Sequence, residues 1–210
     1  MNLIKFEQSG FIFETNEGFR LALDIGSKTP LSKLAAVRCD AMLVSHIHSD
    51  HFSPEHIKAL LPKKLYLNQE CQDALTETVP SCEILTIKEG DTINVGGITV
   101  LVFSVDHGPN ANPLKENLGF LLTTDNQTIY FAGDMFYPSG IDVSSLEVDK
   151  ALLPVGTYYT FGPEEAVDFA KQFKRIGNTV PMHYEKDPQT REQFVALAQQ
   201  AGLRTETAPL

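Results

Sequence analysis

The chain lacks a cluster of basic residues. Its 17 Lys and Arg residues are outnumbered by 27 Asp and Glu residues, so the formal net charge is −10 at pH 7. Nucleic-acid binding normally depends on clustered Lys and Arg side chains that displace counterions from phosphate, and here Lys63-Lys64 is an isolated pair. The composition therefore disfavours a nucleic-acid partner. It leaves a small anionic substrate open, because bound divalent ions can dominate a local field.

Cysteine is scarce, and long apolar runs are absent. Cys39, Cys71 and Cys82 are odd in number and lack the Cys-x-x-Cys spacing, which argues against a disulfide framework and fits a reducing cytoplasm. No stretch is apolar enough to span a bilayer, and residues 2–7 lack the apolar core of a signal peptide. We therefore expect a cytoplasmic protein without membrane association, and an exported antibiotic-degrading enzyme is disfavoured.

The chain does contain a dense group of metal-binding side chains. His46, His48, Asp50 and His51 lie within six residues, directly after the apolar stretch 41–45 that predicts a buried strand. Imidazole and carboxylate groups suit zinc and similar divalent ions. Histidine-rich tracts also occur as tags or low-complexity sequence, but this one is internal and includes a carboxylate. The cluster therefore favours a metal site.

Further candidate ligands lie at the ends of other predicted strands. His107 follows the strand pattern 98–105, and His183 ends the pattern 178–182. Asp134 follows the pattern 128–132, with Gly133 allowing a close turn of the backbone beside it. Asp24 follows the pattern 19–23. Its carboxylate is expected either to orient a ligating imidazole or to serve a turn after the strand, and the sequence leaves both roles open.

The order of these residues resembles the metallo-β-lactamase superfamily. The His-x-His-x-Asp-His run at 46–51, the later His107, Asp134 within Ala-Gly-Asp, and the final His183 match its successive metal motifs. The segments 159–166 and 181–184, which contain Thr-x-Gly-Pro and Pro-Met-His-Tyr, look like those of small metal-dependent hydrolases similar to the ascorbate-6-phosphate lactonase branch.

The resemblance implies a site for two divalent ions. One ion would bind His46, His48 and His107, the second would bind Asp50, His51 and His183, and Asp134 would bridge them. Asp50 and Asp134 are accordingly the expected catalytic carboxylates. Zinc is expected from the nitrogen-rich donors, with manganese, iron and nickel as alternatives. A hydroxide shared by the ions would attack a small-molecule ester, lactone or amide.

Other residues are weaker candidates for the same site. His56 lies in the first turn of a predicted helix after Ser53-Pro54-Glu55, where it could contact substrate or be solvated. Asn110 belongs to a turn-rich segment, 107–117, that could overhang the metals. The candidates at the remaining segments are Tyr159 and Thr160 as substrate contacts and Tyr184 as a support for His183. Local packing is the alternative interpretation of Tyr159, and turn geometry is the alternative for the segment of Asn110.

The alternation of strand and helix patterns predicts an α/β (α+β) fold. Helix patterns cover 53–61, 69–78, 163–175 and 188–201, and strand patterns fill most of the remainder. Strands such as 100–103 are too apolar for a solvated face, so two sheets should pack on each other under amphipathic helices. We expect a single domain over residues 1–210 with the four-layer αββα sandwich of the metallo-β-lactamase type.

Alternative functions remain within the same fold. A phosphodiesterase or RNA-processing nuclease is disfavoured by charge. An iron-dependent redox protein is a further alternative, although His48 stands where the di-iron flavoprotein pattern has a carboxylate. A noncatalytic metal-binding module would not need so complete a ligand set. The assembly state is open, a homo-oligomer included, and the expected partner is a small-molecule substrate.

Overall fold

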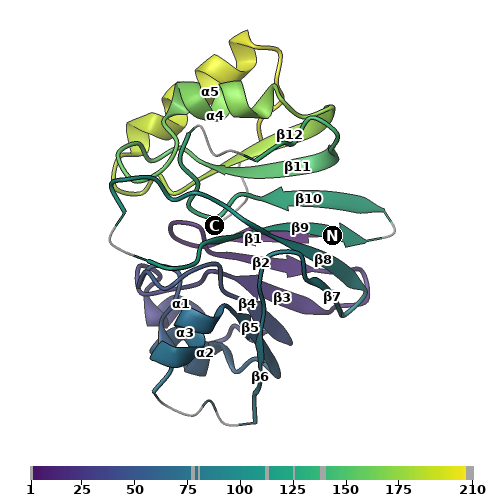
Figure 1. Ribbon diagram of the computed structural model, residues 1–210, viewed down its shortest axis with the longest axis vertical. Helices are drawn as coiled ribbons and strands as arrows, with labels where there is room; N and C mark the ends of the chain where they lie inside the picture. Colours follow the sequence, from purple (N-terminus) through teal and green to yellow (C-terminus); the bar gives the residue numbers. More distant parts are fainter. Residues whose placement is uncertain are drawn as a thin grey trace.

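Two six-stranded mixed sheets form the centre of the molecule (Figure 1). The computed structural model describes residues 2–76, 79, 81–111, 114–124, 126–137 and 141–206. The first sheet has the order β1 (Asn2–Lys5), β2 (Phe11–Glu14), β3 (Arg20–Leu23), β4 (Ala41–Leu43), β5 (Lys64–Leu67) and β6 (Glu83–Thr86). The second has the order β12 (Arg175–Met182), β11 (Glu147–Pro154), β10 (Gln127–Phe131), β9 (Leu118–Thr124), β8 (Ile98–Ser104) and β7 (Thr92–Val95).

Helices cover the outer face of each sheet. On the first sheet these are α1 (Leu31–Leu34), α2 (Pro54–Leu60) and α3 (Gln69–Ala74), and on the second they are α4 (Pro163–Ala170) and α5 (Pro188–Gln200), as Figure 1 shows. The four layers confirm the αββα sandwich expected from the sequence. Within the described residues, none of the helices combines the length and the apolar character that crossing a bilayer requires.

The alternation of apolar side chains in the first sheet separates two cores. Phe11 and Phe13 of β2 are fully buried in the core shared with the second sheet, whereas Ile12 between them belongs to the core under α2 and α3. In β4, Leu43 belongs to the core shared with the second sheet and Met42 to the core under the helices. Successive side chains of a strand point to opposite faces, and each fully buried one contributes about 1.5–3 kcal/mol. A strand buried on both faces must therefore be apolar throughout.

Strand direction brings six chain segments to one edge of the sandwich. In the first sheet β3 and β4 are parallel, and β1 runs the same way because it is two antiparallel pairings away from β3. In the second sheet β8, β10 and β12 share one direction by the same reasoning. Ligand sites of open α/β sheets form at the carboxyl ends of such strands. The predicted ligands follow β4, β8, β10 and β12.

Helix lengths differ from the prediction in two places. The helix predicted over 163–175 ends at Ala170, because pairing of Arg175 with Glu147 begins β12 directly after it. Phe173 is nevertheless buried, with its ring centroid 5.1 Å from that of Tyr130. The apolar character of Phe173 therefore reflects its burial and not a continuation of the helix. The helix predicted over 69–78 ends at Ala74, and residues 77 and 78 lie outside the described residues.

Candidate metal centre

The structure brings the seven predicted ligands together at this edge, where they form a cage. The loop after β4 carries the 46–51 cluster from the first sheet, and the loops after β8, β10 and β12 carry the other ligands from the second sheet. Two compact groups have one donor atom per residue within 4.8 Å of one another. The first comprises His46, His48 and His107, and the second comprises Asp50, His51 and His183. These are the two triads implied by the family resemblance.

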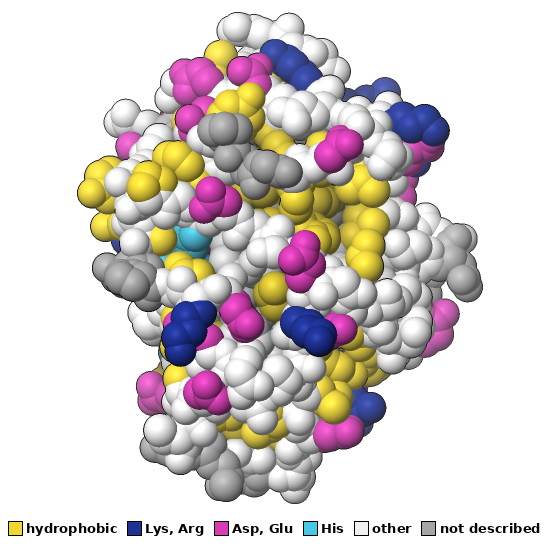
Figure 2. Space-filling model, in the orientation of Figure 1, with side chains coloured by type: hydrophobic (Ala, Val, Ile, Leu, Met, Phe, Trp, Pro, Cys, Tyr) yellow, Lys and Arg dark blue, Asp and Glu magenta, His cyan; other side chains and the backbone are white. Residues whose placement is uncertain are grey.

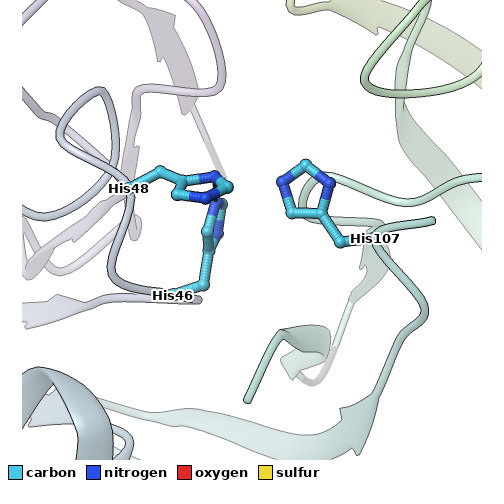
Figure 3. Close-up of side chains that lie close together, drawn as sticks. All are labelled: His46, His48 and His107. Atoms are coloured by element: carbon cyan, nitrogen blue, oxygen red, sulfur yellow. Dashed lines mark hydrogen bonds between the residues drawn. The ribbon is translucent and has the colours of Figure 1, made fainter. Parts of the chain in front are cut away.

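The first group consists of three imidazoles (Figure 3). Nε2 of His46 lies 3.0 Å from Nδ1 of His48. The ring of His107 approaches from the opposite sheet, with its centroid 5.0 Å from that of His46 and 4.9 Å from that of His48. His46 and His107 are buried, while His48 is half-buried and lines a cleft. The group is therefore enclosed on one side and accessible on the other.

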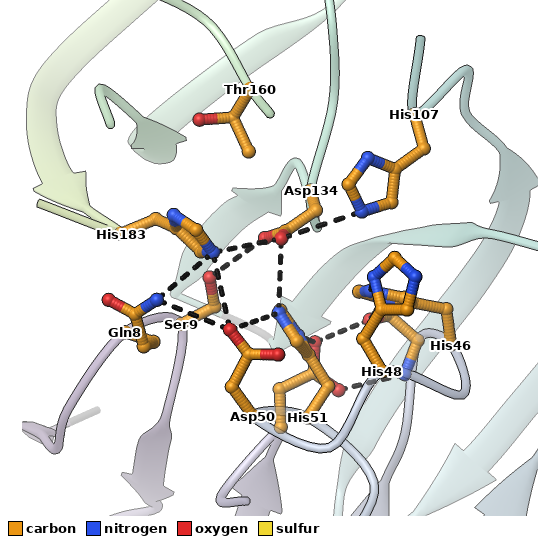
Figure 4. A network of polar contacts seen from close by, with 12 residues as sticks. Gln8, Ser9, His46, His48, Asp50, His51, His107, Asp134, Thr160 and His183 are labelled. Carbon is orange, nitrogen blue, oxygen red and sulfur yellow. Dashed lines mark hydrogen bonds and ion pairs between the residues drawn. The ribbon is translucent and has the colours of Figure 1, made fainter. Parts of the chain in front are cut away.

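Asp134 lies between the two groups (Figure 4). Its Oδ2 is 2.9 Å from Nε2 of His183, 3.2 Å from Nε2 of His51 and 3.6 Å from Nε2 of His107. Asp50 faces the same centre, with Oδ2 3.6 Å from Nε2 of His183 and 4.0 Å from Nε2 of His51. One carboxylate oxygen of Asp134 thus borders residues of both groups, as a bridging ligand must.

The unpartnered atoms of the cage fit metal ions. Nε2 of His48 and Nδ1 of His107 are buried and make no hydrogen bond within the described part of the chain, and Nε2 of His51 and of His107 approach only carboxylate oxygens of the other predicted ligands. Buried polar atoms normally have partners, and leaving several of them unpaired at one place is costly. Donor atoms that share one ion at about 2.0–2.2 Å lie about 2.8–3.6 Å apart. The contacts of Asp134 and the 3.0 Å separation of His46 and His48 lie in or at the limit of this range.

Opposite charges accumulate in the second group. Burial raises the pKa of Asp134, but His183 and His51 outweigh it and hold this pKa well below the usual value. The pKa of Asp50 is likewise lowered by His183 and His51 against the effect of burial. Burial lowers the pKa of His183, but Asp134 and Asp50 raise it to about 9. For His51, Asp134 and Asp24 overcome burial and raise the pKa well above its usual value. The carboxylates thus create a strongly cation-attracting point.

The first group has the opposite character. Burial lowers the pKa of His46 well below its usual value, and the neighbouring His51 and His107 lower it further. Burial and His107 also lower the pKa of His48. Both rings are therefore neutral near pH 7, and a neutral imidazole has the free lone pair that a metal ion requires.

Asp24 holds the imidazole of His51. Its Oδ2 lies 2.7 Å from Nδ1 of His51, and its Oδ1 accepts a hydrogen bond from the Ser45 backbone amide at 2.8 Å. The Ser45 hydroxyl donates to Oδ2 as well. Asp24 is fully buried and has a φ of 44°. Because the carboxylate accepts from Nδ1, Nε2 of His51 is left to face Asp134, which is the arrangement that the orienting role of Asp24 requires.

Two glycines allow ligand loops to pack against the strands. A Cβ on Gly26, just after Asp24, would overlap the backbone of Asp50 and His51. A Cβ on Gly156 would overlap the carbonyl oxygen of His183. Only a residue without a side chain permits these backbone approaches. The ligand positions therefore depend on close packing as well as on the ligands themselves.

His56 does not fit the expected substrate contact. Its side chain is buried, with Nδ1 2.8 Å from the Ser53 hydroxyl and Nε2 2.8 Å from the Thr29 carbonyl oxygen. Both ring nitrogens are occupied, so neither the substrate-contacting nor the solvated His56 envisaged from the sequence matches the structure. The ring instead ties α2 to the loop that precedes α1.

The other residues that the sequence suggested as weaker candidates lie in different parts of the molecule. Tyr159 lines the cleft above the cage, whereas Asn110 and Thr160 line a neighbouring hollow of about 640 Å³. The amide of Asn110 donates to the Tyr158 carbonyl oxygen at 2.8 Å. Asn112 and Pro113, in the segment expected to overhang the metals, lie outside the described residues. The ring of Tyr184 lies between the cations of Lys5 and Arg191, 4.7 and 5.5 Å from the ring centroid.

Sequence reasoning missed three residues of this site. Gln8 and Ser9, in the turn between β1 and β2, are buried against the cage, and the Ser9 hydroxyl donates to Oδ1 of Asp134 at 3.2 Å. Lys186 follows the loop of His183 and stands on the wall of the cleft. A signal for Gln8 and Ser9 was available, since β1 ends at the same edge as β3. No sequence pattern distinguishes Lys186 from other exposed lysines.

The cage opens into a cleft of about 200 Å³. Its walls include His48, Asp50, His107, Asp134 and His183 together with Ser49, Tyr159 and Lys186. On the face shown in Figure 2, a small patch of histidine surface is visible in a hollow, and Lys and Arg side chains are interspersed with Asp and Glu. Drug-sized ligands occupy pockets of about 300–1,000 Å³, so the volume suits a small substrate.

Comparison with known proteins agrees with the geometry. The family model described as the beta-lactamase superfamily domain matches residues 2–183. The chain belongs to the metallo-β-lactamase superfamily. The match extends from β1 to the last ligand of the metallo-β-lactamase site, so every segment that forms the cage lies within it.

Relatives of this metallo-β-lactamase-fold chain match it over most of its length. A UPF0173 metal-dependent hydrolase of Pyrobaculum neutrophilum is 29% identical over 202 residues, covering 91% of this chain and 88% of the relative. A UPF0173 metal-dependent hydrolase of Opitutus terrae is 29% identical over 232 residues, covering 96% and 94%. The solved structure of the metallo hydrolase Igni18 from Ignicoccus hospitalis has a TM-score of 0.80 at 23% identity, covering 99% and 94%, and shows the same fold. The similarity to the ascorbate-6-phosphate lactonase branch stays a prediction.

Proposed function

We propose that this protein is a hydrolase that depends on two divalent ions and acts on a small-molecule ester, lactone or amide. The observation that carries the proposal is the convergence of two triads of ligands with Asp134 between them, whose Oδ2 lies within 3.6 Å of ring nitrogens from both triads. The names of the relatives support the metal dependence and the hydrolytic reaction but not the substrate class. Zinc is the proposed metal, as in the sequence-based expectation, and a cytoplasmic location stays a prediction.

Each ion would have its own protein ligands. His46, His48 and His107 would hold one ion, Asp50, His51 and His183 the other, and Asp134 would contact both. When bound, such ions supply Lewis acidity toward a carbonyl oxygen and lower the pKa of water, which provides a nucleophile near neutral pH. Asp24 accepts from Nδ1 of His51, so that once an ion displaces the second proton of this ring, Nε2 is the nitrogen that would bind the ion.

The open side of the cleft would bind the substrate. Tyr159 and Lys186 line the cleft together with the predicted ligands, and Nζ of Lys186 lies 5.2 Å from the ring centroid of Tyr159. The neighbouring Glu185 is paired with the buried Lys5. Lys186 is exposed and has no ion pair among the described residues, so its charge is available to a substrate in the cleft. A substrate that carries a carboxylate or phosphate group would gain Coulomb attraction there.

Replacing Lys186 with Met tests this substrate preference. We expect KM for an anionic ester to rise about tenfold with little change in kcat, since a charge pair near a surface is worth about 1–4 kcal/mol. A neutral ester of the same chain length should be hydrolysed as before. The measurement compares the nitrophenyl monoester of a dicarboxylic acid with that neutral ester. Lys171→Met, an exposed lysine just after α4, is the control, and equal effects on both esters would contradict a role in charge recognition.

A substrate panel tests the proposed reaction class. The metal-loaded protein and its chelated form are assayed on generic lactones, esters, amides and phosphodiesters. We expect metal-dependent cleavage of a carbonyl substrate. Cleavage of phosphodiesters alone would replace the proposal by the nuclease alternative, and oxygen consumption without hydrolysis would replace it by the redox alternative.

A further inference from the structure

The turn between β1 and β2 places a buried amide beside the second group of ligands. Gln8 is 1% exposed, and its Nε2 lies 3.2 Å from Oδ2 of Asp50 and 3.3 Å from Nε2 of His183 (Figure 4). Both contacted atoms are predicted donors to the same ion. The side chain is therefore aimed at the position of that ion rather than at the solvent.

The backbone holds this side chain in place at a cost. Gln8 has a φ of 55°, in the left-handed region that residues with a Cβ seldom adopt. The turn is closed by hydrogen bonds from Phe6 N to Gly10 O and from Gly10 N to Glu7 O, and the Gln8 carbonyl oxygen accepts from the His183 amide at 3.2 Å. Strained residues persist where the surrounding structure fixes them, and they gather at functional sites.

One end of the amide has no partner. Oε1 of Gln8 is buried and makes no hydrogen bond within the residues that the structure describes. A half-turn about the last side-chain torsion, which has a broad two-fold profile, exchanges Oε1 and Nε2. An N–H group cannot bind a cation, whereas an amide oxygen can. With an ion between Asp50 and His183, the oxygen is the end that the electrostatics favour.

We propose that Gln8 is an additional protein ligand of the second ion through its amide oxygen. Donors that share an ion at about 2.0–2.2 Å lie about 2.8–3.6 Å apart, and the two separations from Gln8 fall in this range. The inference rests on the proposed metal-dependent function. It gives the second site oxygen donors from Gln8, Asp50 and Asp134 beside the nitrogens of His51 and His183, whereas the first site has three imidazoles and shares Asp134.

The two sites should consequently differ in metal preference. Oxygen donors and higher coordination numbers suit manganese and similar harder ions, whereas few nitrogen-rich donors in a tetrahedral arrangement suit zinc. The second site, with five protein donors, should therefore accept Mn²⁺ more readily than the first. Asp50 already gives the second triad one oxygen donor that the first triad lacks, and the turn that carries Gln8 would add a further oxygen and a higher coordination number.

The decisive variant is Gln8→Leu, which keeps the approximate size and removes both amide atoms. We expect the dissociation constant of the first, tighter-bound equivalent of Mn²⁺, which occupies the second site, to rise on the order of 10–100-fold by calorimetry, with the tighter-bound equivalent of Zn²⁺ at the first site unaffected. In the Co²⁺-loaded protein, visible absorption should intensify, because loss of a ligand lowers the coordination number. Gln193→Leu, whose amide contacts Glu164 on the surface, should match the wild type.

The outcomes separate this inference from the proposed function. If the wild type binds two ions and Gln8→Leu binds both with unchanged affinity and an unchanged Co²⁺ spectrum, Gln8 is not a ligand although the metal-dependent function stands. Weaker binding with an unchanged spectrum would also overturn the inference, since Gln8 would then act through a hydrogen bond to Asp50. If the wild type binds no metal at all, both proposals fail. Thermal unfolding of the metal-free variant checks that the turn still folds.

Discussion

Replacing Asp134 with Ala is expected to lower kcat/KM about 10³-fold or more, since metal catalysis supplies several kcal/mol of transition-state stabilisation. Oδ2 of Asp134 lies within 3.6 Å of a ring nitrogen of His51, His107 and His183, so its loss removes a donor from both sites. Metal content, measured on the same preparation, should fall below two ions per chain. The defect should appear mainly in kcat, because Asp134 is a buried part of the cleft wall among the metal ligands.

Two further variants make the Asp134 result specific. Asp134→Asn keeps the volume and an oxygen for the Ser9 hydroxyl but removes the charge, and it should also lose activity. Asp142→Asn, an exposed carboxylate that accepts from the Ser144 amide, should behave as the wild type. Full occupancy by two ions together with normal turnover in Asp134→Ala would show that this residue does not bridge the ions.

Replacing Asp24 with Asn is expected to weaken metal binding and activity on the order of 10–100-fold although Asp24 touches no predicted substrate position. Asn keeps the size and can still accept from the Ser45 amide. Its amide nitrogen, however, would face Nδ1 of His51, which must then accept a hydrogen bond and carry its proton on Nε2. A protonated Nε2 cannot bind a metal. A buried carboxylate that orients a catalytic imidazole in serine proteases shows the same wrong-tautomer effect.

The Asp24 prediction is checked by calorimetric titration with metal and by steady-state kinetics on the same samples. Circular dichroism and thermal unfolding of the metal-free variant should stay close to the wild type, since the side-chain volume is preserved. Asp73→Asn on the exposed side of α3, where the carboxylate accepts from Gln69, is the matched control. Unchanged metal affinity in Asp24→Asn would mean that Asp24 serves only the turn after β3.

Much of this site could be predicted from the sequence because its residues follow strands. His107, Asp134 and His183 each come just after an apolar strand pattern. Parallel strands bring their carboxyl ends to one edge, so residues distant in the chain had to meet. The apolar strands also specified the sandwich, since strands buried on both faces need layers on both sides.

The rest depended on contacts that no local pattern encodes. His56 lies in the first turn of α2 as predicted, but its ring is buried and contacts the carbonyl oxygen of Thr29, which belongs to a different loop. Gln8 lies in an ordinary turn sequence, and only the packing of that turn against the His183 loop reveals its place. Lys186 resembles the other exposed lysines in sequence, and only the folded structure places it on the wall of the cleft. Ala170 ends α4 because β12 pairs with β11, which is a tertiary constraint.

The most direct measurement is an anomalous-scattering map of crystals of the protein loaded with Zn²⁺ or Mn²⁺, combined with metal analysis of the same sample. We expect two peaks, one among His46, His48 and His107 and one among Asp50, His51 and His183, with Asp134 next to both. We also expect turnover to disappear on chelation and return with metal. Full turnover in a protein without bound metal, or peaks remote from these side chains, would contradict the proposed metal centre.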